Sequence, residues 1–128
     1  MKSLLLVLMC IPLHSGIFNM DTISRAISAG DVTTLEKYFD ETVEIAILGD
    51  EDIFERVKAT DLLRTFFAKN QPKTFSQVHQ GTSKGNDSIY CIGNLATNSG
   101  LFRVYIYLHT KDDNGKYLIQ ELRFDKEE

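Results

Sequence analysis

The stretch from Phe75 to Phe124 alternates between runs of β-branched and aromatic residues and short turns that contain glycine. These runs predict strands over residues 74–81, 88–97, 101–110 and 116–125. The turn before the last strand contains Asn114-Gly115, the strongest short hairpin signal. Strands that follow one another through short turns pair antiparallel, so the second half of the chain is predicted to form a meander.

Helical periodicity precedes this sheet. The clearest helix ends at about residue 69, because Pro72 cannot continue a helix and disfavours helical geometry in the residue before it. Its apolar residues repeat at the spacing of one helix face, namely Ala59, Leu62, Leu63, Phe66 and Phe67. Helices followed by a meander are typical of an α+β domain in which the helices cover one face of the sheet.

The segment before that helix predicts a corner between two helices and then a short hairpin. Gly30 suits the left-handed residue that ends a first helix, and Asp31 suits the N-cap of a second. One side of the second helix is expected to carry Leu35, Tyr38 and Phe39. Residues 43–47 alternate as a strand, and the acidic turn at 49–52 leads to a second short strand at 53–56.

The first 16 residues have the features of a secretory signal peptide. Lys2 precedes an apolar run of about ten residues, which is within the range of a signal peptide and well short of the roughly 20 residues that cross a bilayer. A buried first helix fits less well, because no polar face interrupts the run and Pro12 would break it. Cleavage near Ser15 or Gly16 would leave residues 17–128 as a single exported domain, periplasmic or secreted, with no stable membrane span.

The charge and the cysteine content of the mature chain limit its possible functions. Loss of Lys2 leaves thirteen basic and eighteen acidic residues, a net charge of about −5, which argues against binding to nucleic acid. Cys10 leaves with the signal peptide, so Cys91 has no partner for an internal disulfide. Cys91 stands in an apolar strand, where a cysteine is usually a small buried hydrophobe.

The order of elements resembles the cone-shaped fold of the nuclear transport factor 2-like superfamily, also called cystatin-like. Several motifs are similar to those of a family of small exported bacterial proteins classed as a domain of unknown function: Ala29-Gly30-Asp31, Tyr38-Phe39, Phe66-Phe67-Ala68-Lys69-Asn70, Gln80-Gly81, Gly100-Leu101-Phe102-Arg103-Val104-Tyr105 and Gly115-Lys116-Tyr117-Leu118-Ile119. The resemblance spans nearly the whole mature chain. It implies N-terminal helices on the concave face of a curved, mainly antiparallel sheet, and it implies no particular activity.

Strand alternation separates the two faces of this sheet. On the last two strands, the residues expected to face the helices are Phe102, Val104, Ile106, Leu108, Leu118, Gln120, Leu122 and Phe124. A pocket on that side would be lined by Phe66, Phe102, Val104, Gln120 and Leu122. Ile119 is expected to face outward, together with an interface set of Tyr90, Arg103, Tyr105, Tyr107, Tyr117, Glu121 and Arg123. Tyrosine and arginine are enriched at binding hot spots, but they also pack well against one another as ordinary strand residues.

Catalytic and metal motifs are weak in this chain. The acid or base candidates are Tyr38, His79 and Glu44, none with a convergent second group. A lone strand histidine is usually structural or at the surface, and a tyrosine at a helix end is more often at the rim of the core. His79 and His109 stand apart without ligands at a metal-binding interval, so no metal and no cofactor are expected. The acidic turn at 50–52 lacks the alternating oxygen ligands of a calcium loop.

Two hypotheses follow. The leading one is an exported, non-catalytic binding or protein-interaction module, homodimeric through the exposed sheet face, whose ligand is a partner chain or a small apolar molecule. The alternative is a small-molecule isomerase or hydrolase with a pocket between helices and sheet and with Tyr38, His79 or Glu44 at its mouth.

Overall fold

The computed structural model describes residues 20–83, 85, 87–110 and 116–127, and the predicted signal peptide and the turn at 112–115 fall outside these residues. The helices are α1 (Met20–Ala29), α2 (Val32–Glu36) and α3 (Arg56–Lys69). The strands are β1 (Phe39–Ile47), β2 (Asp50–Glu55), β3 (Pro72–Thr82), β4 (Ser88–Thr97), β5 (Gly100–Thr110) and β6 (Tyr117–Lys126). No helix of the described part is long and apolar enough to cross a membrane.

The corner between α1 and α2 forms as the sequence predicts. Gly30 has a φ of 66°, in the left-handed region where a glycine ends a helix at least cost. Asp31 caps α2, because its carboxylate accepts hydrogen bonds from the amide (3.1 Å) and the hydroxyl (2.6 Å) of Thr34. These hydrogen bonds, that from the hydroxyl foremost, hold the pKa of Asp31 below its ordinary value. The second helix is shorter than expected, since Phe39 already belongs to β1 and pairs with Ile119 on β6.

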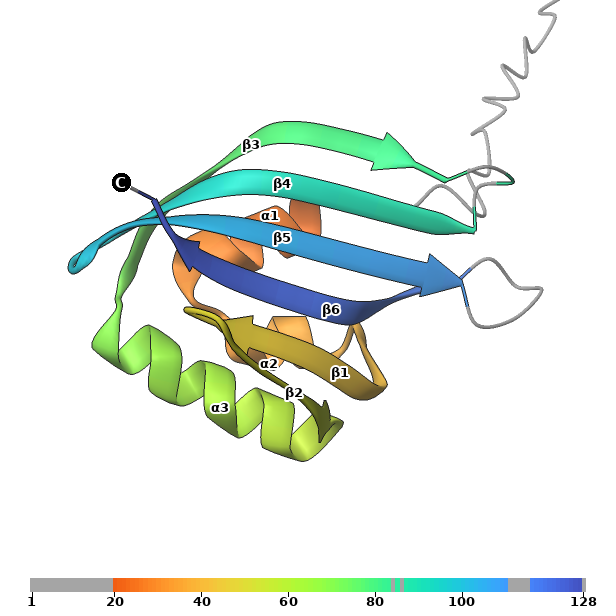
Figure 1. Ribbon diagram of the computed structural model, residues 1–128, viewed down its shortest axis with the longest axis horizontal. Coiled ribbons are helices and arrows are strands. Elements are labelled where there is room, and N and C mark those ends of the chain that lie inside the picture. Colours follow the sequence, from red (N-terminus) through yellow and green to blue (C-terminus); the bar gives the residue numbers. More distant parts are fainter. Residues whose placement is uncertain (1–19, 84, 86, 111–115, 128) are drawn as a thin grey trace, which may run out of the picture.

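One curved sheet contains all the strands of the described chain, in the order β2-β1-β6-β5-β4-β3. The predicted meander of β3 to β6 is antiparallel throughout, and only the contact between β1 and β6 is parallel. Figure 1 shows the helices on the concave side of this sheet, with α3 alongside the β1–β2 hairpin. The α+β fold predicted from the sequence is therefore confirmed.

A β-bulge in β6 corrects part of the predicted facing. Tyr107 on β5 lies opposite Glu121, but the next residue of β5, Leu108, lies opposite Ile119, so Gln120 is the extra residue. An extra residue reverses the alternation of the residues before it. Ile119 is consequently fully buried on the helix-facing side, whereas Leu118 turns outward, the opposite of the prediction for both residues.

The helix-facing side is a packed hydrophobic core. The Phe66 ring of α3 lies 4.6 Å from the ring of Phe124, 5.3 Å from that of Phe102 and 5.6 Å from that of Phe67, measured between centroids. Edge and tilted contacts at these separations are favourable for aromatic rings. Leu63, also on α3, is fully buried in the same core.

Candidate interaction face

We define the convex face as the sheet surface opposite the helices, which none of the described helices covers. Cross-strand pairing places most of the predicted interface residues on it side by side. Tyr107 lies opposite Tyr90 on one side and Glu121 on the other, and Tyr105 lies opposite Arg123. Arg103 belongs to the same face and is half-buried, since it donates hydrogen bonds to Asn94 and Glu127 at 3.1 and 3.0 Å.

Tyr117 is the exception among the predicted interface residues. It lies before the bulge at Gln120, so it turns toward the helices and packs against the hydrophobic core. The prediction that Tyr117 faces outward is wrong for the same reason as that for Ile119.

Apolar side chains are unusually exposed on the convex face. The set comprises Ile53 at 66%, Leu101 at 41%, Tyr90 at 37% and Tyr105 at 37% exposure. Ile53 joins this face because it pairs with Glu44, which in turn lies beside Glu121. The face therefore extends from β2 to β4 and combines exposed apolar groups with charges of both signs.

An ion pair crosses three strands of the convex face. Arg123 on β6 and Glu51 on β2 approach to 3.0 Å although β1 runs between them. Ala46 of β1 is the residue beneath this pair, and it is 1% exposed although it is on the face opposite the core. A small residue at position 46 is what allows the two long side chains to meet above it.

Glu121 stands in an excess of negative charge. Burial, and next the neighbouring carboxylate of Glu44, raise the pKa of Glu121, and Arg123 at 3.8 Å only partly offsets this effect. Glu51, which also raises the pKa of Glu121, is the carboxylate that Arg123 contacts more closely. Among the described residues of this corner, three carboxylates thus share one guanidinium.

We expect Glu121→Gln to stabilise the protein at neutral pH. A carboxyl whose pKa is raised on folding binds protons more strongly in the folded state, so stability falls as pH rises from the unfolded pKa of about 4.3 to the folded one. The glutamine variant should therefore exceed the wild type by about 0.2–1 kcal/mol at pH 7, the scale of a cross-strand charge pair. The difference should vanish near pH 3, as measured by denaturant unfolding. Glu51→Gln, which removes the closest partner of Arg123, is the control and should bring no gain; a variant less stable than the wild type at pH 7 would contradict the assignment.

A cavity of about 250 Å³ opens on the convex face between β4 and β5. It is lined by Tyr90, Cys91, Ile92, Tyr105, Ile106, Tyr107 and Glu121. Two of its tyrosines are held by their hydroxyl groups: that of Tyr90 lies 3.0 Å from Nε2 of His79, and that of Tyr107 lies 2.8 Å from Oγ of Ser88. The Tyr90 ring leans over Gly81 on β3, where any side chain would collide with it. These contacts fix the directions of the Tyr90 and Tyr107 rings.

The predicted pocket on the helix-facing side is occupied by the protein itself. Phe66, Phe102, Val104 and Leu122 are all buried members of the hydrophobic core. Gln120, the polar member of the predicted set, donates a hydrogen bond from Nε2 to Oδ2 of the buried Asp40 at 3.1 Å. These residues are positioned to stabilise the fold.

The three acid or base candidates lie in different parts of the molecule. Tyr38 follows α2 and packs against the core. Glu44 is on β1 and His79 is on β3, with β6, β5 and β4 between them, which is roughly 19 Å at the usual strand spacing. Acid and base partners must come within hydrogen-bond reach of one substrate, so the sheet order gives no support to a dyad of Glu44 and His79.

In the described part of the chain, neither the candidate metal ligands nor Cys91 is arranged for metal binding or thiol chemistry. There, no group of three or more histidine, cysteine, aspartate or glutamate side chains could hold a metal ion. Cys91 is fully buried on the helix-facing side, and this burial raises the pKa of its thiol, the opposite of the shift found at reactive cysteines.

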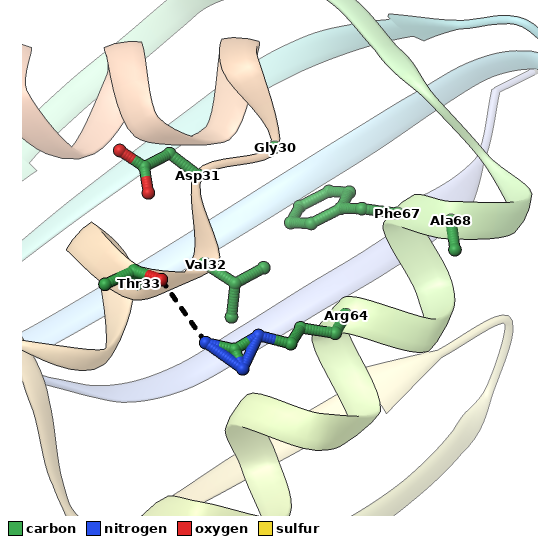
Figure 2. Close-up of a pocket in the computed structure, with 7 residues that line it drawn as sticks. All are labelled: Gly30, Asp31, Val32, Thr33, Arg64, Phe67 and Ala68. Carbon is green, nitrogen blue, oxygen red and sulfur yellow. Dashed lines mark hydrogen bonds between the residues drawn. The ribbon is translucent and has the colours of Figure 1, made fainter.

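A second hollow, of about 310 Å³, lies between the α1–α2 corner and α3. Figure 2 shows Arg64 reaching from α3 toward Thr33, to whose hydroxyl it donates a hydrogen bond of 3.3 Å. Val32 and Phe67 are buried side chains of its lining. The nearby Asp31 carboxylate is engaged with Thr34.

Comparison with known proteins agrees with this architecture. Residues 20–125 match the domain of unknown function DUF4783. The chain belongs to this family. A DUF4783 protein of Bacteroides ovatus has a similar solved structure, with 33% identity, a TM-score of 0.79 and coverage of 89% of this chain and 98% of its own. For a DUF4783 protein of Bacteroides uniformis the values are 27%, 0.79, 84% and 96%.

The wider likeness of this DUF4783 chain concerns the fold. An NTF2-like protein of unknown function from Cytophaga hutchinsonii shares 12% identity at a TM-score of 0.58, with coverage of 83% of this chain and 86% of its own. No curated protein sequence matches the chain. The fold is nuclear transport factor 2-like, as the sequence predicted, and the family description assigns no activity.

The sequence of this DUF4783 protein did not reveal two features of the convex face. It predicted the tyrosines but not the cavity between them, because their hydrogen bonds to His79 and Ser88 depend on pairing across strands. It also left out Ile53, whose exposure depends on the place of β2 at the edge of the sheet. The apolar pair Ile53-Phe54 within the otherwise acidic segment from Asp50 to Glu55 was the available signal.

Proposed function

We propose that the protein is an exported, non-catalytic protein-interaction module that pairs with a second copy of itself through the convex face. The observation that carries the proposal is the gathering of Ile53, Tyr90, Leu101 and Tyr105 on one uncovered sheet surface. Tyr90 and Tyr105 are near neighbours on β4 and β5, whereas charged residues of the same face separate them from Ile53 and Leu101. Exposed apolar groups interspersed with charges are typical of interaction surfaces. Export rests on the basic and apolar character of the first 16 residues.

Self-pairing is supported by the mixture of groups on the convex face. A two-fold interface brings the same patch of both copies together, so the patch must contain apolar groups and charges that can face their opposites. The convex face supplies Arg103 and Arg123 as well as Glu44 and Glu121. Most apolar side chains on the helix-facing side of the sheet are buried in the core, so this side offers less exposed apolar surface to a partner.

Tyr105→Ala is expected to weaken the dimer at least tenfold, or about 1.4 kcal/mol, because a central exposed tyrosine is a common hot spot. Sedimentation equilibrium of the mature protein measures the dissociation constant. Val57→Ala, which trims an exposed apolar residue of α3, is the matched control and should leave the dimer unchanged. A wild type that stays monomeric at millimolar concentration would refute self-pairing.

A further inference from the structure

The cavity on the convex face is shaped for the end of one long side chain. Its volume of about 250 Å³ suits a single inserted group rather than a large ligand. Its lining includes Tyr90, Ile92, Tyr105 and Tyr107, together with Glu121 from the neighbouring strand β6. The hydrogen bonds of Tyr90 to His79 and of Tyr107 to Ser88 fix the directions of two of these rings before any partner arrives.

Such a preformed space lowers the cost of binding, because fewer side chains need to be ordered when the partner enters. Interface hot spots lie in pockets of this kind, and arginine is one of the residue types that fill them.

Electrostatics select a cation for this space. Glu121, Glu44 and Glu51 lie on adjacent strands around Arg123, which contacts Glu51 at 3.0 Å and Glu121 at 3.8 Å. A second cation beside Glu121 would relieve the repulsion between Glu121 and Glu44, whereas an anionic or neutral group would not. Tyrosine faces attract cations as well, so walls and rim favour the same charge.

Among cations, the guanidinium group matches this site best. It is planar and stacks on aromatic rings, and it can donate two parallel hydrogen bonds to one carboxylate. An ammonium group is more strongly hydrated and offers no flat surface to the tyrosines.

We propose that this cavity receives an arginine side chain of a protein partner, with the guanidinium stacked among Tyr90, Tyr105 and Tyr107 and bound to Glu121. The proposal rests on the convex face being the interaction surface. It adds the chemistry of the group that the cavity recognises.

The test compares two peptides that differ in one charge. Acetyl-Gly-Arg-Gly-amide is titrated into the ¹⁵N-labelled mature protein, and the same peptide with citrulline, a neutral analogue of arginine, is the matched control. We expect the arginine peptide to shift the amide signals of Tyr90, Ile92, Tyr105 and Tyr107 and to bind at least tenfold more tightly than the citrulline peptide. Ile53→Ser is titrated in parallel to weaken self-pairing, which would compete with the peptide for the same face. The change removes the most exposed apolar side chain of the convex face and lies outside the cavity lining.

Two variants test whether the Glu121 carboxylate is the group that binds the arginine side chain. Glu121→Gln should weaken the arginine peptide at least tenfold and leave the citrulline peptide unchanged. Glu55→Gln removes an exposed carboxylate of the edge strand β2 that lies outside the cavity lining. It should change the affinity for neither peptide.

The outcomes separate this inference from the proposed function. Equal binding of both peptides at these signals would overturn the selectivity for arginine and leave the face as a binding surface. Absence of shifts with both peptides, in wild type and in Ile53→Ser, would overturn the inference, while a dimer weakened by Tyr105→Ala would still support the module. A strictly monomeric protein with no shifts would overturn both.

Discussion

Replacing Phe66 by alanine is expected to lower the free energy of unfolding by about 3–5 kcal/mol, the usual range for a buried phenylalanine. The ring is 5% exposed and contacts the rings of Phe67, Phe102 and Phe124 at once. Its removal takes apolar surface out of the core and leaves a space that the surrounding strands cannot close. Urea denaturation of wild type and variant measures the loss, with an unchanged slope as the sign that the unfolding transition is the same.

The same variant tests whether the helix-facing side is filled. An apolar cavity created by truncation stays dry and can bind a small molecule such as benzene. Saturating benzene should therefore raise the melting temperature of Phe66→Ala and leave that of the wild type unchanged. Val57→Ala, on the same helix but 71% exposed, is the control and should lose little stability and gain nothing from benzene. An equal rise in the wild type would mean that an open apolar pocket already lies beneath the helices.

Much of the fold could be predicted because its signals are local. The corner at Gly30 and Asp31 depends on one left-handed glycine and one capping carboxylate within a few residues. The buried face of α3 and the strands of the meander follow from periodicities of 3.6 and 2 within single segments. None of these features needs knowledge of a distant partner.

The facing of Tyr117, Leu118 and Ile119 could not be predicted in this way. It depends on the bulge at Gln120, in a strand that pairs with β5 on one side and with β1 on the other. The pairing of β1 with β6 also shifts register between Phe39 and Glu44. A sequence pattern of period 2 contains no information on where such a long-range mismatch falls.

The candidate site also combines features with a local sequence signal and features that depend on long-range pairing. The residue types of the convex face were readable from alternation on β4 and β5, which run without a bulge between Ser88 and Thr97. The cavity was not, because it depends on the direction in which Tyr90 and Tyr107 lean, and their hydroxyl partners lie on other strands.

Gln120→Leu is expected to destabilise the protein by about 1.5–3 kcal/mol although leucine is more apolar and of similar size. Gln120 donates a hydrogen bond of 3.1 Å to Oδ2 of Asp40, whose Oδ1 accepts one from the amide of Glu41 at 2.6 Å. Asp40 is 4% exposed, so a lost donor is not readily replaced by water. Hydrogen bonds to a charged group contribute about 1.5–3 kcal/mol, which sets the size of the expected loss.

Two further variants show whether the stability depends on the hydrogen bond of the Gln120 amide. Gln80→Leu, at an exposed amide on β3, should stay within about 0.5 kcal/mol of the wild type in the same denaturation experiment. Asp40→Asn combined with Gln120→Leu should cost less than the two single changes added together, because the carboxylate that needs the donor is then absent. If Gln120→Leu were as stable as the wild type, Gln120 would be free to serve as a polar group of a pocket, and the filled helix-facing side would lose its main polar support.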